Sequence, residues 1–538
     1  MKKALALTLV IALLLSTVSM EFIGIANADP YVPPEEPPSG YMINSDGRYV
    51  GENLRRNGDT YTLTGNINCP IAILCNNIVL DGAGYSVQGN GVSAGIWLRY
   101  RSGLTIKNLN IKNFEYGIKF SYDRYSQGKT VDCTIVGNKI TNNKYGMLIT
   151  SSSQCYIADN YIAHNTYGVN MQTSNGGIFR NNRFAGNQYA ILDEGYRDND
   201  IDTSNKIDGK PIYYWVNKHD LTVPSNAGMV RLKNCTGIKV ENLVLAGTGN
   251  GLMLVNTNGS TISGNKLSEN THGIILRNSF SNIIFSNIVA NNTGSGIEIG
   301  SGDNLVDVRS WNNKVSNNDV IGNGYGVVCI ENNTISNNQI IANQKVGITA
   351  GPNCNITDNY VSKNLQYGIF IRDISGCSLL GNNVTLNEGY GIHFEFGPNA
   401  MIKGNYISKN NIGIWIGAAF FNNIISNTII ENDGLGIKME GSHHDNLIYH
   451  NNFIDNNKGD IQASIAQVWF YPDLHKRLPR GETPRPPRLV DGAANAWDDG
   501  AEGNYWSDYQ SAGNTPYYIN ENNQDNHLTQ GTARNLHP

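Results

Sequence analysis

The sequence has few charged residues, and beyond its N-terminus it has no long apolar run. Only 16% of the 538 residues are charged, and the formal net charge is −5 with a pI near 6.1. This balance leaves no basic surface for nucleic acid, so we expect no nucleic-acid partner. None of the eight cysteines lies in a C-x-x-C pair, which leaves zinc ribbons and thioredoxin-like redox motifs without support.

The first residues have the features of a signal peptide. Two lysines precede an apolar run from Ala4 to Leu15, and the small residues at 26–28 offer a cleavage site. We expect residues 1–28 to be removed, which leaves a secreted, periplasmic or cell-surface protein without a transmembrane domain. The alternative is an uncleaved membrane anchor, for which the run is short.

Asparagine is over-used, and it recurs at a fixed spacing. The pattern Asn, any, apolar, any, any, Asn occurs twelve times, mostly 20–24 residues apart, with a glycine usually three or four residues after the second Asn. The first asparagines of the pairs are Asn138, Asn160, Asn182, Asn265, Asn287, Asn318, Asn338, Asn359, Asn382, Asn405, Asn427 and Asn451.

Each repeat unit holds two or three short period-2 segments separated by Asn and Gly corners, and no segment has a helical period. A unit of this size cannot bury its own apolar face, whereas stacked copies can. The sequence therefore predicts an all-β fold, a right-handed parallel β-helix of the pectin-lyase type with roughly 17 coils at ~4.8 Å each, a rod of ~80 Å. A leucine-rich repeat is the alternative, but the units use Ile, Val and Phe freely where that repeat needs Leu.

The repeated asparagines predict two side-chain ladders inside the coil corners. Each amide bonds the next, and Asn also tolerates the left-handed backbone of a sharp corner. The ladders satisfy polar groups at buried turns, where an unpaired group costs ~1–3 kcal/mol.

The composition divides the chain into segments. A proline-rich leader at 29–45 precedes the β-helix at 46–463. An excursion at 193–228 interrupts the period of the β-helix, and we expect its aromatic residues to pack back on the helix. A basic, proline-rich linker follows at 464–496. The aromatic segment 497–538 is expected to cap the open end, since unpaired strand edges invite aggregation.

Three stretches carry a resemblance to a known family. "IVLDGAGYSVQGNG" (78–91), "IDGKPIYYWVNKHDLTVPSNAG" (207–228) and "GNYWSDY" (503–509), together with the repeats, resemble the NosD-like exported right-handed β-helix proteins, whose repeat region overlaps the carbohydrate-binding and sugar-hydrolysis (CASH) domain. The resemblance implies either handling of extracellular glycans or a periplasmic accessory role in copper delivery to nitrous-oxide reductase.

The cofactors that this resemblance implies are copper and calcium. The link at 510–514 is only "QSAGN", where the family commonly has an Asp/Gly-rich loop, so a calcium loop there has little support. No copper-ligand motif carries over residue by residue. The His-dense stretch of the chain supplies His443, His444 and His450 as candidate metal ligands, because imidazole suits copper, although exposure at a turn also explains them.

Two outward columns on the late coils form the candidate ligand site. Residues two positions after each corner glycine point outward, and here they are Phe370, His393, Trp415 and Lys438. The column two residues further on supplies Arg372, Glu395 and Glu440. The two large rings lie two coils apart, ~10 Å, about the length of a disaccharide. Either they stack on sugar rings, or the cap or the excursion covers them.

The same charged residues, Arg372, Glu395 and Glu440, are the candidate catalytic groups for a polysaccharide lyase or a glycoside hydrolase. A solvated sheet face with one ion pair explains them equally simply. We therefore expect a protein that binds polysaccharide or cell-surface glycan without catalysis, with an enzyme on the same face and a NosD-like copper role as the alternatives.

The register also groups cysteines. Cys133 and Cys155 each lie five residues before a ladder asparagine, as do Cys354 and Cys377, so each pair should occupy equivalent places in adjacent coils. Disulfides 133–155 and 354–377 are therefore expected, and Cys69 and Cys75 are a third candidate pair. The alternative is a stack of reduced thiols that fills the core, as expected for Cys235 and Cys329.

Overall fold

The computed structural model describes residues 36–525. Within this range it leaves out 122–129, 194–196, 301–308, 442, 460–461, 466–467, 471–487, 491–494, 499–501, 508–516 and 521–522. The expected signal peptide lies outside the described residues, as do part of the leader and most of segments 464–496 and 497–538. Within the described residues, no helix has the length and hydropathy needed to cross a bilayer.

Each coil contributes three short strands, one to each of three parallel sheets. One coil consists of β48 (Met401–Lys403), β49 (Tyr406–Ser408) and β50 (Ile412–Phe420). Inward-pointing residues of these strands, Ile402, Ile407 and Ile414, are fully buried. Because successive side chains of a strand point to opposite faces, an apolar residue at alternate positions fills the core from all three sides. The predicted right-handed parallel β-helix of about 17 turns is confirmed.

The corners have left-handed backbone, but not at the ladder asparagines. The residue before each ladder Asn has the positive φ: Gly404 (φ 67°) precedes Asn405, and Lys409 (φ 54°) precedes Asn410. The expectation that the ladder Asn itself takes this conformation was wrong. The left-handed residue turns the chain, and the next residue can then direct its amide into the corner.

The two predicted Asn ladders are confirmed. The Asn405 side chain donates to Asn427 Oδ1 (2.9 Å) and accepts from the backbone and the side chain of Asn382 (2.9 Å each). The same pattern links Asn387, Asn410 and Asn432 at the next corner. A third, partial ladder lies five residues earlier in some coils, at Asn282, Asn313 and Asn333 and again at Asn422 and Asn446. Asn495 of the last segment continues it beyond Asn446.

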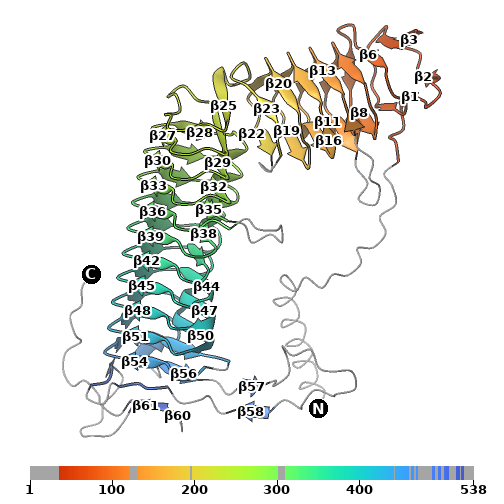
Figure 1. Ribbon diagram of the computed structural model, residues 1–538. Coiled ribbons are helices and arrows are strands. Elements are labelled where there is room, and N and C mark those ends of the chain that lie inside the picture. The colour runs from red at the N-terminus through yellow and green to blue at the C-terminus, as the bar shows by residue number, and fades with distance from the viewer. Residues whose placement is uncertain are drawn as a thin grey trace, which may run out of the picture.

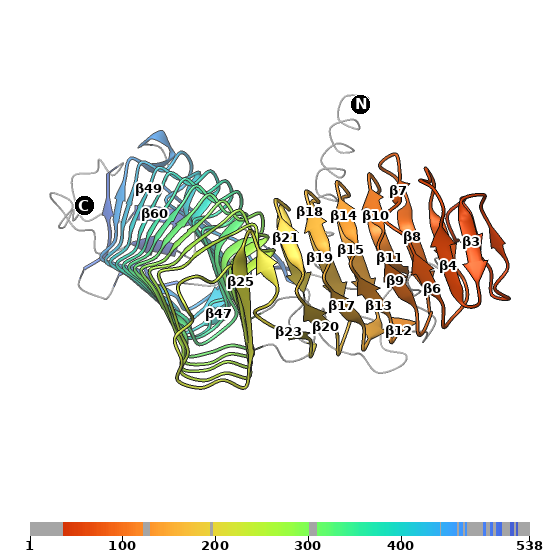
Figure 2. The same ribbon diagram turned by 90° about the horizontal axis from the view of Figure 1, so that it is seen from above.

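The coils form two limbs that meet at a bend (Figure 1). The N-terminal limb is coloured from red to yellow, and the C-terminal limb from green to blue. Seen from above, the C-terminal limb is viewed along its axis, and the N-terminal limb extends to one side (Figure 2). The buried apolar residues accordingly fall into two clusters, from Ile43 to Met229 and from Val223 to Trp506. The coils therefore do not make the single rod expected from the repeat.

Two sheets face the inside of this bend, one on each limb (Figure 1). The inner sheet of the N-terminal limb consists of β1 (Tyr41–Ile43), β2 (Tyr49–Val50), β5 (Ile71–Ile73), β8 (Ala94–Arg99), β11 (Tyr116–Ser121), β15 (Tyr145–Thr150), β19 (Tyr167–Gln172) and β22 (Tyr189–Asp193). The inner sheet of the C-terminal limb consists of β25 (Lys210–Val216), β26 (Met229–Lys233), β29 (Asn250–Val255), β32 (His272–Arg277), β35 (Ser295–Ile299), β38 (Tyr325–Cys329), β41 (Ile348–Ala350), β44 (Ile369–Asp373), β47 (Tyr390–Pro398), β50, β53 (Ile437–Met439) and β56 (Ala463–Ile465).

Two further rows of strands complete each limb, and the second row of the N-terminal limb continues through β24 into β25 of the inner C-terminal sheet. On the N-terminal limb they are β3 (Leu54–Asn57), β4 (Thr60–Leu63), β6 (Val79–Asp81), β9 (Thr105–Lys107), β13 (Thr134–Val136), β17 (Tyr156–Ala158), β20 (Ile178–Arg180) and β23 (Asp200–Ile201), and then β7 (Ser86–Gln88), β10 (Asn110–Lys112), β14 (Lys139–Thr141), β18 (Tyr161–Ala163), β21 (Arg183–Ala185) and β24 (Lys206–Ile207). On the C-terminal limb they run from β27 (Lys239–Glu241) to β54 (Leu447–Tyr449) and from β28 (Val244–Ala246) through β55 (Asn452–Ile454) to β59 (Tyr505–Trp506).

The bend is built around β25, which lies within the segment read from the sequence as an excursion. This strand pairs antiparallel with β24 and parallel with β26, so the segment contributes to the sheets and is not a loop outside them. Its alternating side chains divide between the two cores, since Tyr213 and Trp215 pack on one cluster and Tyr214 packs on the other. A fully buried ion pair, Arg231 Nε to Asp193 Oδ1 at 3.2 Å, joins the limbs beside this strand.

The far end of the C-terminal limb is covered by residues from the last segment. Strand β59 pairs with β55, and Trp506 stacks on Phe453 with ring centroids 4.2 Å apart. Asn504 continues the ladder, and Asp525 accepts from its backbone N–H (2.7 Å) and from Trp506 Nε1 (3.0 Å).

Candidate functional site

The candidate ligand residues lie on the inner sheet of the C-terminal limb. The strand register places Phe370 on β44 beside His393 on β47, then Trp415 on β50 and Lys438 on β53. Their neighbours along each strand point into the core and are fully buried, as with Ile392 and Phe394 around His393. The alternation of the strands therefore directs this column away from the core.

The rings of this column form a cluster with two tyrosines that the sequence analysis did not single out. His393 lies at its centre, with ring centroids 4.4 Å from Trp415, 4.9 Å from Phe370 and 4.8 Å from Tyr367. Tyr390 stacks on Tyr367 at 5.2 Å and lies parallel to the Trp415 ring at 6.2 Å. The rings therefore contact one another, and together they make one aromatic surface on the sheet.

His393 is held neutral within this cluster. The side chain is 7% exposed, and burial lowers its pKa to about 4. Its Nδ1 has no hydrogen-bond partner among the described residues. A neutral ring at the centre keeps the surface apolar near neutral pH, which suits contact with the C–H faces of a ligand.

Phe370 and Trp415 are half-buried, and the rings that partly cover them belong to the same sheet. Among the described residues of the last segment, Trp497 and Trp506 pack into the end of the core instead. A Cβ at Gly417 would lie 2.5 Å from the Glu395 carbonyl oxygen and 3.0 Å from Cζ3 of Trp415, so the close approach of the neighbouring strand favours glycine there. Part of each ring thus stays accessible.

Charged groups lie beside the rings. Glu440 accepts from Trp415 Nε1 through Oε2 (3.0 Å) and from Lys438 Nζ through Oε1 (2.7 Å). Burial raises the pKa of the Glu395 carboxyl, and the neighbouring Arg372 opposes this rise. The site therefore offers two cationic donors and two carboxylates within reach of the rings, a set that fits the hydroxyl groups of a sugar. A catalytic role for Arg372, Glu395 and Glu440 stays a prediction.

The three histidines considered as metal ligands lie in different surroundings. His443 is buried with its Nδ1 3.3 Å from the side-chain amide of Asn495, and burial lowers the pKa of its imidazole to about 4. His444 stacks on Phe420 with ring centroids 5.0 Å apart and contacts Asp445. His450 Nε2 lies 3.3 Å from a carboxylate oxygen of Glu502. In the described part of the chain, no three His, Cys, Asp or Glu side chains are grouped as metal ligands. Binding of copper or calcium stays a prediction.

All eight cysteines are free thiols in the structure. The register places Cys133 one coil from Cys155 and Cys354 one coil from Cys377. Cys354 also has a second sulfur neighbour, because the Sγ atom of Cys329 lies 3.7 Å from its own. Cys75 is buried and Cys69 is partly exposed. The proposed disulfides, including 69–75, stay predictions.

A second aromatic feature lies on the inner sheet of the N-terminal limb. Tyr116, Tyr145, Tyr167 and Tyr189 stack in successive coils, with centroid separations of 5.1, 4.7 and 5.2 Å. Three of them precede a corner glycine, and Tyr367 and Tyr390 do the same in the other limb. The repeated Tyr-Gly dipeptide is the sequence signal that would have revealed this column.

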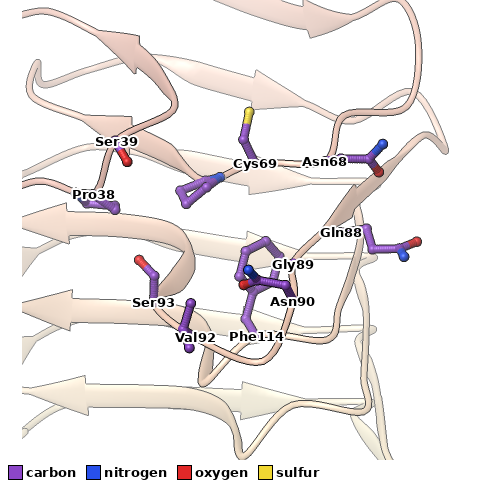
Figure 3. A pocket seen from close by; sticks show the side chains of 11 residues that line it. Pro38, Ser39, Asn68, Cys69, Gln88, Gly89, Asn90, Val92, Ser93 and Phe114 are labelled. Carbon is purple, nitrogen blue, oxygen red and sulfur yellow. The ribbon is translucent and has the colours of Figure 1, made fainter.

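A cavity of about 550 Å³ lies at the far end of the N-terminal limb. Its lining includes Phe114, Asn90 and Ser93 and contains no charged residue. The Asn68 and Gln88 side chains at its edge are directed away from Asn90 (Figure 3). Since the polar groups do not converge on one point, we regard the aromatic surface as the better candidate site.

Two family models match parts of the chain. Residues 346–511 match the family described as "Periplasmic copper-binding protein (NosD)", and residues 94–211 and 213–351 match the right-handed beta helix region. No curated protein sequence matches the chain.

Several solved structures resemble the chain at low identity. A mutant of the periplasmic alginate epimerase AlgG has 10% identity and a TM-score of 0.35, with 79% of this chain and 83% of that chain covered. The A-module of the Azotobacter vinelandii mannuronan C-5 epimerase AlgE6 has 14% identity and a TM-score of 0.22, with 71% and 86% covered. A tailspike mutant of the E. coli bacteriophage HK620, in complex with a pentasaccharide, has 12% identity and a TM-score of 0.27, with 75% covered in each chain.

The NosD match covers the coils that carry the aromatic surface, and the β-helix matches cover most of the coils before them. Together with the parallel sheets and the Asn ladders, these matches identify the chain as a NosD-like right-handed β-helix protein.

Proposed function

We propose that this protein binds an extracellular or cell-surface polysaccharide on the aromatic surface formed by Tyr367, Phe370, Tyr390, His393 and Trp415. The observation that carries the proposal is a set of four half-buried rings packed around His393 on one sheet, with charged groups beside them. Sugars present C–H groups that pack on such rings, and hydroxyl groups that bond to charged side chains. The expected N-terminal signal peptide would bring the protein to the compartment where such polymers occur.

The spacing of the rings sets the size of the ligand. Phe370 and Trp415 occupy the same column two coils apart, which corresponds to ~10 Å, about the length of a disaccharide. Arg372 lies in the coil of Phe370 at one end of this interval, Glu395 lies in the middle coil beside His393, and Lys438 and Glu440 lie in the coil beyond Trp415. A short oligosaccharide laid along the limb would therefore meet rings in the middle and charged groups at both ends.

The test is oligosaccharide binding by the mature chain, starting from a glycan array and followed by titration calorimetry. Trp415→Ala should weaken binding at least about tenfold, which corresponds to ~1.4 kcal/mol, while the far-UV spectrum and thermal unfolding stay close to wild type. Trp311→Ala is the matched control, since this half-exposed tryptophan lies in the same limb outside the surface. Equal affinity of Trp415→Ala and wild type would show that the surface is not the binding site.

A copper role is the second candidate, because the NosD family that matches residues 346–511 is described as copper-binding. Titration with Cu(I) and Cu(II) tests it directly. Replacing both His444 and His450 with glutamine should abolish saturable binding if these imidazoles hold the metal. Saturable copper binding with wild-type glycan affinity would separate the two functions.

A further inference from the structure

The third, partial ladder is interrupted in three successive coils of the C-terminal limb. Between Asn333 and Asn422, the strand register fills its column with three residues that carry no amide, namely Cys354, Cys377 and Ala400. The amide-to-amide bonds that join neighbouring coils elsewhere in this ladder therefore cannot form in these coils. Any other link between coils at this place would take over part of the role of the missing amides.

A contact between two sulfur atoms lies at the first of these coils. The Sγ atoms of Cys329 and Cys354 are 3.7 Å apart, and the two residues are 2% and 1% exposed. A disulfide bond has an S–S distance of about 2.05 Å, so the two atoms must approach by about 1.7 Å to form one. Rotation of both side chains about their Cα–Cβ bonds can supply a movement of this size.

The two cysteines belong to adjacent coils. Cys329 is the last residue of β38, and Cys354 directly precedes β42 (Asn355–Thr357) in the next coil. The two positions are 25 residues apart in the sequence, so a bond between them would enclose about one full coil. A cross-link of this kind stabilises the folded chain mainly because it restricts the unfolded one.

Neighbouring thiols are directed at carbonyl groups. Cys377, which lies one coil beyond Cys354 in register, donates its Sγ–H to the Gly351 carbonyl at 3.3 Å. Cys235, in the same limb, donates to the Lys233 carbonyl at 3.3 Å. The sequence register favoured a link between positions 354 and 377, whereas the positions of the sulfur atoms favour a link between 329 and 354.

We propose that Cys329 and Cys354 form a disulfide bond when the protein folds in an oxidising compartment, and that this bond fastens two coils where the third ladder is interrupted. The free thiols of the structure are the reduced form of this pair. The inference is independent of the proposed binding of glycans.

The oxidant in this reaction is a small-molecule or protein disulfide. The thiolate of one cysteine attacks the oxidant's S–S bond, so a mixed disulfide forms and one oxidant thiol leaves. The second cysteine then displaces the other oxidant sulfur, and the oxidant ends as two thiols that carry the two cysteine protons. Since both cysteines are buried in the folded protein, the exchange takes place before the coil of β41 closes over that of β38.

The bond would act next to the aromatic surface. Strand β41 pairs directly with β44, where Thr349 lies beside Phe370, the first ring of the outward column. A cross-link between the coils of β38 and β41 would therefore reduce local opening of the coil against which that ring is placed.

Peptide mapping without reductant provides the first test. The full mature chain is refolded from its reduced, denatured state in a glutathione redox buffer, and free thiols are blocked with N-ethylmaleimide before digestion. Most molecules should contain a 329–354 linkage. A 354–377 linkage, or free thiols at 329 and 354, would overturn the inference, and free thiols would show that the pair is only a contact between reduced cysteines.

Serine variants provide the second test. Cys377→Ser should leave the 329–354 linkage as in wild type. Cys235→Ser is the matched control, because it removes another buried thiol of the same limb, and it should also keep the linkage. Loss of the linkage in Cys377→Ser but not in Cys235→Ser would overturn the inference, because it would make Cys377 part of the bonded group.

Hydrogen exchange tests whether the bond fastens the coils. In the linked wild-type protein, reductant should speed exchange in peptides from residues 330–353 at least about threefold. Cys329→Ser should show no such response, and the wild-type comparison by itself needs no variant to fold. The local measurement separates this bond from a 133–155 linkage, which lies in the other limb. Equal exchange of linked wild-type protein with and without reductant would refute the fastening role.

Discussion

Replacement of Asn405 by leucine tests the ladder that holds the C-terminal limb together. The Asn405 amide is 1% exposed, and its Oδ1 accepts from the backbone N–H and the side-chain amide of Asn382, both at 2.9 Å. Its Nδ2 donates to the carbonyl of Leu379 at 2.9 Å. Leucine would take the partner from the Asn382 N–H and from the Leu379 carbonyl in a buried corner, and it would leave the Asn382 amide with only its bond to the Ile356 carbonyl (2.8 Å). At ~1–3 kcal/mol for each of these two unsatisfied groups, the loss of stability should be at least about 2 kcal/mol.

The neighbouring Asn411 supplies a matched control, because it lies one residue beyond the next corner with an exposed side chain. Asn411→Leu should change the unfolding free energy by less than about 0.5 kcal/mol. Denaturant unfolding followed by circular dichroism compares the stability of the two variants. Hydrogen exchange of peptides that contain residue 382 reports the loss of stability locally. The local measurement is needed because repeat arrays need not unfold as one unit. Equal stability of the two variants, with residue 382 still protected, would refute the role assigned to the ladder.

Further predictions concern pH, the bend and the thiols. Burial lowers the pKa of His393 from 6.5 to about 4, so the unfolded state takes up the proton first and this residue alone should reduce stability by about 3 kcal/mol as the pH drops from 6.5 to 4. His443 has the same shift, so His393→Phe should remove about half of the combined decline, and an unchanged profile would contradict the burial argument. Asp193→Ala should cost about 3–5 kcal/mol because it leaves the Arg231 charge buried without its partner, whereas the double replacement Asp193→Leu/Arg231→Met should recover most of that loss in thermal unfolding. Mass mapping without reductant should find a 133–155 linkage in protein from an oxidising compartment, and free thiols throughout would leave the stack of reduced cysteines as the correct interpretation.

The candidate site could be predicted in part. Phe370, His393, Trp415 and Lys438 are each the second residue after a corner glycine, so the sequence predicted that they form one column. The strand register confirms that alignment. The sequence did not indicate that Tyr367 and Tyr390 join the rings, because they precede the glycine and lie in a different column. It also gave no sign that His393 would be buried: a residue on an outward face becomes buried only when neighbouring side chains close over it.

The sequence by itself determined the coil, its corners and its ladders. These features repeat every 20–24 residues, and each depends on a short stretch and on its copy one turn away, so the spacing of Asn and Gly is enough to predict them. The third ladder was open to the same reasoning, since Asn422 lies five residues before Asn427 just as Asn405 lies five before Asn410. Only the tertiary structure decided that the coils divide into two limbs and that two inner sheets face one another across a bend. That geometry depends on contacts such as Tyr189 with Thr293, which are 104 residues apart and follow no repeat, and on a buried ion pair whose partners the period does not relate.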